Sequence, residues 1–401
     1  MMLKVVSTKE ADEIIERELS CSSKKTERVG IGSLTGRILA CDIFSSENVP
    51  SFDRVTVDGY AVQSADTFGS SESIPSQLEI RGEILMGQAA KESIATGQCI
   101  KISTGGMLPE GADSAVMVEN TEEAFDGSCL VYKAVSPFEN VTKKGDDVKK
   151  GDRVLSKGTV ISSKHIGVLA SLGVTEAECV KRLRVGIISS GDEVVGIENE
   201  PLAGQVRDVN SHILSALCGE RGCECVKYGI ISDNYEKLLS TVERASAESD
   251  ILLLSGGSSA GARDMTVKVI ASLGEVFLHG VAMKPGKPTI VGKIGECAVF
   301  GLPGHPAAAY FTALRFVVPL IKRLYGSVFE EKSVNAVTAF NISSNHGREE
   351  FIPVKLEGGV AYPIFRKSGV ISLLCEADGY TVIDRNKEGL KKSEEITVHL
   401  F

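Results

Sequence analysis

The chain has 401 residues, which is enough for roughly two to four compact domains. Apolar residues make up 43% of it and charged residues 24%, the balance of a globular protein with a proper core, and no apolar run approaches the length of a membrane span. The net charge of −9 and the absence of tryptophan argue against a broad nucleic-acid surface and against a stacking platform for bases.

The start of the chain predicts an amphipathic helix. Ser7 and Glu10 have the spacing of a capping box, and Ala11, Ile15 and Leu19 fall on one face. Because this segment does not resemble a signal peptide, we expect a cytoplasmic protein. The ten cysteines lack the paired spacing of zinc or redox sites, so we expect buried, reduced thiols.

The region from about residue 28 to 181 is β-rich and irregular. Short alternating runs at 78–84, 99–105, 114–120 and 129–135 are broken by Gly, Pro, Ser and Asp, which favours one or two small β-domains. The charged segment 143–155 is typical of turns between short strands.

Strands and helices alternate from about Leu183 to Gly326. Strands are expected at 184–191, 224–233 and 250–257, and helices at 208–222, 235–249, 264–274 and 307–325. This alternation predicts βαβ units and a doubly wound parallel sheet with both faces covered. Beyond Gly326 the short strands predicted at 334–342, 349–357, 360–365, 379–385 and 394–401 indicate a small β-barrel or sandwich.

A cationic loop stands out at 279–288. Lys284 and Lys287 lie among Pro and Gly residues that stiffen the backbone and leave its N–H groups accessible, and the segment GLPGHP follows at 301–306. On an acidic protein such a loop is suited to a small oxyanion or a phosphorylated ligand.

Three Gly-rich loops follow strands of the predicted sheet, at 189–194, 255–261 and 301–306. Each alone could be a tight strand-to-helix turn, but together at the carboxyl edge they favour a phosphate-bearing ligand. The residues expected to contact it are Ser190, Gly191, Ser255, Gly256, Gly257, Gly261, Pro303, Gly304 and His305.

Carboxylates occupy the same loops, at Glu193, Asp233 and Asp264. Since carboxylates beside a phosphate are unfavourable without a cation between them, we predict a Mg2+ site here. The alternative is that Asp264 caps its helix and Asp233 is a turn residue. In the N-terminal half, Asp58 could belong to an Asp-Gly turn and the segment 103–113 to a hairpin connection.

Taken in order, these motifs resemble the MoeA family, which includes the E domain of gephyrin. The match runs through GRILACDI, PSFDRVTVDGYAV, STGGMLPEGADSAVMVE, SSGDEV, DVNS, SGGSSAGARD, KPGKP, GLPGHP and KSGVISLLCEADGY. The resemblance implies a molybdopterin molybdotransferase that inserts molybdate or tungstate into adenylylated molybdopterin with Mg2+ and releases AMP. It also implies a homodimer whose active cleft is shared between subunits, with the molybdopterin adenylyltransferase as a candidate partner.

The resemblance implies four domains: an elongated one from 1–47 and 140–178, an inserted β-rich one at 48–139, a molybdopterin-binding α/β domain at 179–326 and a C-terminal β-domain at 327–401. It places Asp58 and Thr104 on the N-terminal side of the cleft and Glu193, Asp233 and Asp264 on the α/β side. Lys284, Lys287 and Arg348 would surround the oxyanion, and Ser368 would add a hydroxyl.

Two residues in and just after the GLPGHP segment depart from the family pattern. His305 stands where many members have Asn, and Ala308 where a Ser is usual, so one oxyanion donor is lost at a cost of about 1.5–3 kcal/mol. His305 could replace it as a donor or could simply pack in the loop. Two other functions stay open from the sequence: a molybdopterin adenylyltransferase, and a non-catalytic molybdopterin-binding or scaffold protein.

Overall fold

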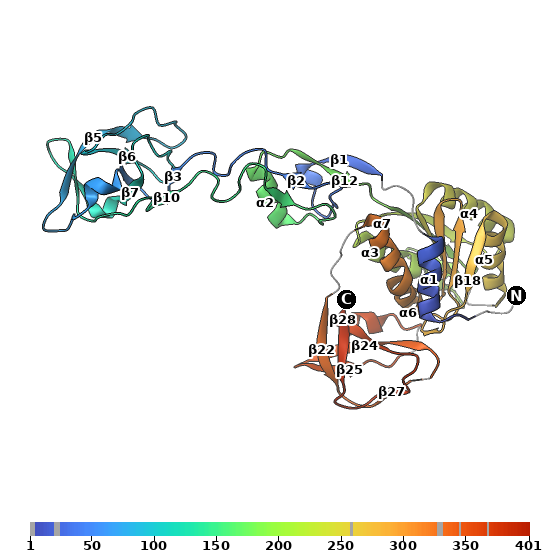
Figure 1. Ribbon diagram of the computed structural model, residues 1–401. Coiled ribbons are helices and arrows are strands. Elements are labelled where there is room, and N and C mark those ends of the chain that lie inside the picture. Colours follow the sequence, from blue (N-terminus) through green and yellow to red (C-terminus); the bar gives the residue numbers. More distant parts are fainter. Residues whose placement is uncertain (1–4, 20–24, 257–259, 327–331, 345, 367–368) are drawn as a thin grey trace.

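The computed structural model describes residues 5–19, 25–256, 260–326, 332–344, 346–366 and 369–401. Figure 1 shows an elongated molecule: a thin arm joins a distal β-rich unit to an α/β unit, and a C-terminal β unit lies beside the latter. None of the helices described has the length and apolarity needed to span a bilayer. Nine of the ten cysteines are described, each as a free thiol and most of them buried, as predicted.

The α/β unit contains a six-stranded sheet with the order β16-β13-β17-β21-β20-β18. Strands β16, β13, β17 and β21 are parallel, as predicted, but β20 runs antiparallel to both neighbours. Only residues 295 and 296 separate β20 from β21, which leaves room for a hairpin turn and not for a crossover helix. The strands of this unit are β13 (Arg184–Ser190), β14 (Val194–Val195), β15 (Val206–Arg207), β16 (Glu224–Ile231), β17 (Ile251–Gly256), β18 (Glu275–His279), β20 (Ile290–Ile294) and β21 (Cys297–Leu302).

Helices cover both faces of this sheet, which confirms the doubly wound arrangement. Ile187 and Leu253 belong to one core and their neighbours Ile188 and Leu252 to the other, because successive side chains of a strand point to opposite faces. Helices α1, α3, α6 and α7 complete the first core, and α4 and α5 the second. The helical segments are α1 (Thr8–Glu18), α3 (Asn210–Gly219), α4 (Tyr235–Glu248), α5 (Ala260–Leu273), α6 (Pro306–Thr312), the π-helical turn η4 (Ala313–Val317) and α7 (Val318–Tyr325).

Helix α1 begins where the capping pattern predicts, and the Ser7 hydroxyl accepts the Glu10 N–H at 3.1 Å. Its buried residues Ala11 and Ile15 pack into the first core of the α/β unit. In space, therefore, α1 belongs with the α/β unit and not with the arm, so the elongated domain expected at 1–47 and 140–178 lacks its first helix (Figure 1).

Five strands of the C-terminal unit close into a barrel, in the order β24-β25-β22-β28-β26 and back to β24. The structure thus decides for a barrel over a sandwich. A sixth strand, β19, comes from the cationic loop of the α/β unit and pairs in parallel with β24. The elements are β19 (Met283–Lys284), β22 (Ser333–Thr338), β23 (Ile342–Ser343), β24 (Glu349–Glu357), β25 (Val360–Pro363), α8 (Ser372–Glu376), β26 (Gly379–Ile383), β27 (Gly389–Leu390) and β28 (Glu395–Leu400).

The distal unit is a six-stranded sheet, β7-β4-β6-β5-β9-β8, and the arm is built from the two-stranded ladders β1–β12, β2–β11 and β3–β10. The segment 103–113 is not a hairpin connection, because the strands that it joins, β6 and β7, lie on either side of β4. These elements are β1 (Thr26–Gly30), η1 (Ile31–Ser33), β2 (Ile43–Phe44), β3 (Arg54–Val55), β4 (Gly59–Val62), η2 (Ser64–Thr67), β5 (Ser76–Ile84), β6 (Gln98–Ile102), β7 (Ser114–Met117), η3 (Val118–Asn120), β8 (Thr121–Glu123), β9 (Ser128–Val131), β10 (Val141–Thr142), β11 (Arg153–Leu155), α2 (Ser163–Ser171) and β12 (Glu176–Val180).

Candidate active site

The cationic loop faces the C-terminal barrel across a cavity of about 700 Å³. Lys284, Lys287 and Arg348 all line this cavity, which we call the cationic cavity, together with Arg366. Pro303, Gly304, His305 and Ala308 line it from the GLPGHP side. Residues from two different units thus bring four basic side chains to one cavity, as an anion site requires.

Two of these cations already have anionic partners: Arg366 pairs with Glu376 at 2.8 Å, and Lys284 pairs with Glu350. The Lys284 ammonium lies 2.6 Å from a carboxylate oxygen of Glu350, which is 7% exposed and also accepts the Ser344 hydroxyl at 2.7 Å. The pair forms because β19 and β24 place Lys284 and Glu350 in register. Sequence reasoning missed Glu350, although its position two residues after Arg348 was a usable signal.

A second cavity of about 430 Å³ lies at the carboxyl ends of β13 and β17. We call it the loop cavity. It shares Gly304 and His305 with the cationic cavity, so the two adjoin. Gly256 is needed here, because a Cβ on it would lie 2.2 Å from the Ser190 carbonyl oxygen, and its φ is +143°. The loop cavity is also lined by Ser189, Ser190, Glu193, Arg207, Asp208, Asn210 and Ser255.

Asn210 holds the loops of this cavity together. Its amide nitrogen donates to the Ser255 hydroxyl at 2.7 Å and to the Gly304 carbonyl at 2.8 Å. Since a carbonyl can only accept, this fixes which way the amide points. The amide oxygen is then buried without a hydrogen-bond partner, and the side chain is 8% exposed. Such an unpaired acceptor in a cavity wall is suited to a ligand donor.

The Asp208 carboxylate connects the end of β13 to the start of α3, the helix that carries Asn210. This carboxylate accepts the Ser189 hydroxyl at 2.9 Å and the Ser211 N–H at 3.1 Å, at the start of α3. Asp208 and Asn210 were read from the sequence only as helix openers. They follow the short strand β15 and not one of the three Gly-rich loops, so only the DVNS motif pointed to them.

The three carboxylates predicted to bind Mg2+ lie in different surroundings. Burial raises the pKa of Asp233, and the carboxylates of Asp192 and Glu193 raise it further. Asp264 is no helix cap, since α5 begins at Ala260 and Asp264 lies in its second turn. Within the described residues no three His, Cys, Asp or Glu side chains form a ready-made metal cluster. The surplus of negative charge around Asp233 nevertheless fits a cation there.

The predicted N-terminal residues lie elsewhere. An Asp58 carboxylate oxygen accepts the Thr104 N–H at 2.8 Å, so the two are neighbours, but in the distal unit and in neither cavity of the same chain (Figure 1). Gly191 and Gly261 lie at the end of β13 and within α5. Gly257 and Ser368 lie outside the described residues.

Comparison with known proteins covers almost the whole chain. Residues 6–173 match the MoeA N-terminal region (domain I and II), 186–323 the "Probable molybdopterin binding domain", and 335–401 the MoeA C-terminal region (domain IV). The chain is 31% identical to a molybdopterin molybdenumtransferase of Haemophilus influenzae, over 94% of each chain. It is 30% identical to the enzyme of that name from Bacillus subtilis, over 94% of this chain and 90% of that one. A molybdopterin biosynthesis MoeA protein from Pyrococcus horikoshii has a similar structure, with a TM-score of 0.88 at 38% identity over 99% of both chains.

Proposed function

The chain belongs to the MoeA family, and from that membership we propose that its two adjoining cavities bring molybdate, or tungstate, to adenylylated molybdopterin. The chain is an enzyme of molybdenum cofactor biosynthesis, a molybdopterin molybdenumtransferase. The oxyanion occupies the cationic cavity, the pterin and its phosphates occupy the loop cavity, and AMP leaves as the metal enters the dithiolene. The observation that carries this assignment is the sharing of Gly304 and His305 by both cavities.

Electrostatic positioning accounts for the chemistry that this chain's residues perform. The metalate and the pterin phosphates are both anions and repel each other in water, so fixed cations must hold them at contact distance. Lys287 and Arg348 approach from the α/β unit and the barrel, and Lys284 lines the same cavity while paired with Glu350. Donors fixed before the substrates arrive need no reorganisation during the reaction.

Magnesium is assigned to the carboxylates beside the loop cavity. Glu193 and Asp233 would hold it together with phosphate oxygens, and Asp264 is the third candidate from the sequence. Mg2+ commonly binds through one or two carboxylates plus substrate phosphates, so a preformed protein cage is not required. When bound, the ion neutralises phosphate charge, and it relieves the mutual repulsion of Asp192, Glu193 and Asp233.

The distal unit is assigned to the active site of a second copy. Asp58 and Thr104 are far from both cavities of their own chain, as Figure 1 makes visible for the two units. A homodimer in which each arm reaches the partner's α/β unit would bring them to the cleft. The division into four domains, with α1 packed on the α/β unit, a cytoplasmic location and delivery of substrate by the adenylyltransferase are parts of the same proposal.

Substitution of Lys287 tests this function. With adenylylated molybdopterin, Mg2+ and molybdate, wild type is expected to release AMP and metal-loaded cofactor without consuming ATP. Lys287→Ala is expected to abolish metal insertion, and so is Lys284→Ala. A matched control is Lys150→Ala in an exposed turn of the arm, which should retain full activity. Metal insertion by the double variant Lys284→Ala/Lys287→Ala at the wild-type rate would refute the assignment, and ATP-dependent adenylylation would favour the adenylyltransferase.

A further inference from the structure

The strand that carries Lys284 is held from both sides. On one side, the Val6 N–H donates to the Gly280 carbonyl at 3.1 Å and the Ala282 N–H to the Val6 carbonyl at 2.7 Å. On the other side, the Glu349 N–H donates to the Ala282 carbonyl at 2.9 Å, and β19 pairs with β24. The N-terminal segment, the cationic loop and the barrel strand therefore form one short ladder.

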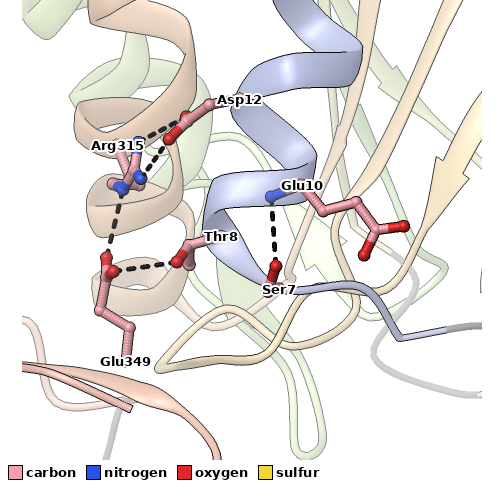
Figure 2. A network of polar contacts seen from close by, with 6 residues as sticks. All are labelled: Ser7, Thr8, Glu10, Asp12, Arg315 and Glu349. Atoms are coloured by element: carbon pink, nitrogen blue, oxygen red, sulfur yellow. Dashed lines mark hydrogen bonds and ion pairs between the residues drawn. The ribbon is translucent and has the colours of Figure 1, made fainter. Parts of the chain in front are cut away.

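Side chains reinforce this ladder, and Figure 2 shows their contacts. Both terminal nitrogens of Arg315 donate to the Asp12 carboxylate at 2.7 Å, and its Nε donates to Glu349 at 3.2 Å. The Thr8 hydroxyl donates to the other Glu349 oxygen at 2.9 Å. Three elements meet in this cluster: α1, the π-helical turn η4 and β24 (Figure 2).

The position of Glu349 links the cluster to the cavity. Arg348 and Glu350 line the cationic cavity, whereas Glu349 between them points to Arg315 and Thr8. Glu349 and Glu350 are the first two residues of β24, where successive side chains point to opposite sides, and Arg348 directly precedes the strand. The contacts that hold Glu349 therefore also restrain the two cavity residues on either side of it.

We infer that Arg315, oriented by Asp12, is a positioning residue for oxyanion binding: by holding Glu349 it sets the separation of Arg348 and Glu350 from the cationic loop. The bidentate pair with Asp12 leaves Arg315 little rotational freedom, and π-helical turns are frequent at functional sites. Arg315 lines neither the cationic cavity nor the loop cavity. This inference rests on the proposed function of the cationic cavity.

Direct binding of molybdate and tungstate to the purified full chain tests it. Arg315→Met is expected to weaken binding of both about tenfold, because Glu349 loses its cation and keeps only the Thr8 hydroxyl as a side-chain partner, so its strand is held less firmly. Arg315→Lys should recover part of the loss, since an ammonium can reach one carboxylate but cannot bridge two. Affinity for AMP, used as a probe of the loop cavity, should stay at the wild-type value in both.

Arg37→Met is the matched control. Arg37 is also largely buried and pairs with Glu27, but in the arm, so its loss should leave the affinity for either probe unchanged. If Arg315→Met does not fold, Thr8→Val removes one hydrogen bond to Glu349 and should weaken oxyanion binding about threefold.

The outcomes separate the two proposals. Oxyanion affinity in Arg315→Met or Thr8→Val equal to that of wild type would overturn the inference, and so would a parallel loss of AMP and oxyanion affinity. Absence of oxyanion binding in the wild-type chain would instead overturn the proposed function, and the inference with it.

Discussion

Asn210 gives the sharpest test of the loop cavity. In Asn210→Ala, two hydrogen bonds are lost, those to the Ser255 hydroxyl and the Gly304 carbonyl. The substitution also removes the amide oxygen that is buried without a partner. In the free protein, losing the hydrogen bonds is destabilising, whereas removing the unpaired oxygen is stabilising. In the complex with a ligand, both changes are unfavourable.

The magnitudes follow from the hydrogen bonds. Losing the two bonds costs about 1 kcal/mol each, and the unpaired buried oxygen already costs the wild type about 1–3 kcal/mol. The terms nearly cancel, so the stability of the free protein should change by no more than about 1 kcal/mol. In the complex, a donor of the pterin pairs with the amide oxygen, and its loss weakens binding by about 1–3 kcal/mol, or about 5- to 150-fold.

Thermal unfolding of the free protein and anaerobic equilibrium binding of adenylylated molybdopterin measure the two quantities. Asn48→Ala is the control, because it loses one hydrogen bond, from the Lys150 N–H at 2.9 Å, in the arm. It should lose a little stability and no affinity. A large drop in the unfolding midpoint of Asn210→Ala together with unchanged affinity would show that the amide oxygen has no ligand partner.

Three further predictions concern single residues. Gly256→Ala should destabilise the α/β unit by about 2 kcal/mol or more, because the new Cβ would lie 2.2 Å from a carbonyl oxygen at a φ of +143°; an unchanged unfolding midpoint would contradict the close approach. Lys284→Ala should lower the stability of the barrel by about 1–3 kcal/mol, because Glu350 is left buried without its cation, whereas Lys287→Ala should not; equal midpoints for the two variants would argue against the pair. A hydrogen bond from a neighbouring thiol lowers the pKa of Cys225 to about 7. Since the thiolate is the reactive form, alkylation of Cys225 by iodoacetamide should rise through pH 7 and level off above it, and a rate still rising at pH 9 would exclude the lowered pKa.

Most of the fold could be predicted from local patterns in the sequence. The Ser7 capping pattern fixes the start of α1 because the cap is made within four residues. The strands that lead into the three Gly-rich loops end at one edge because parallel strands share the direction of their carboxyl ends. The hairpin of β20 and β21 departs from the predicted parallel sheet, because two residues between strands leave room for a turn and not for a crossover helix.

Contacts between distant segments could not be predicted in the same way. Arg315 and Asp12 are 303 residues apart, and Arg315 stands within an apolar helical run, where it looks like an exposed residue of an amphipathic helix. The apolar pattern of α1 in the sequence predicts that one face of the helix is covered, but it does not identify the segment that covers it. The pairing of Lys284 with Glu350 likewise depends on the register of β19 against β24, two strands from different units.

The buried carboxylate of Glu350 bears on the departure at Ala308. Ala308 is 5% exposed and lines the cationic cavity, so the wall there offers no hydroxyl to an oxyanion. The cavity must then rely on charge, and Glu350 takes up part of that charge in the free enzyme by pairing with Lys284. With about half of its side chain exposed, Lys284 can turn toward an arriving anion while it keeps its contact with Glu350. A cation shared in this way holds the dianion less tightly than a free one, which suits a site that must release the metalate to the pterin rather than store it.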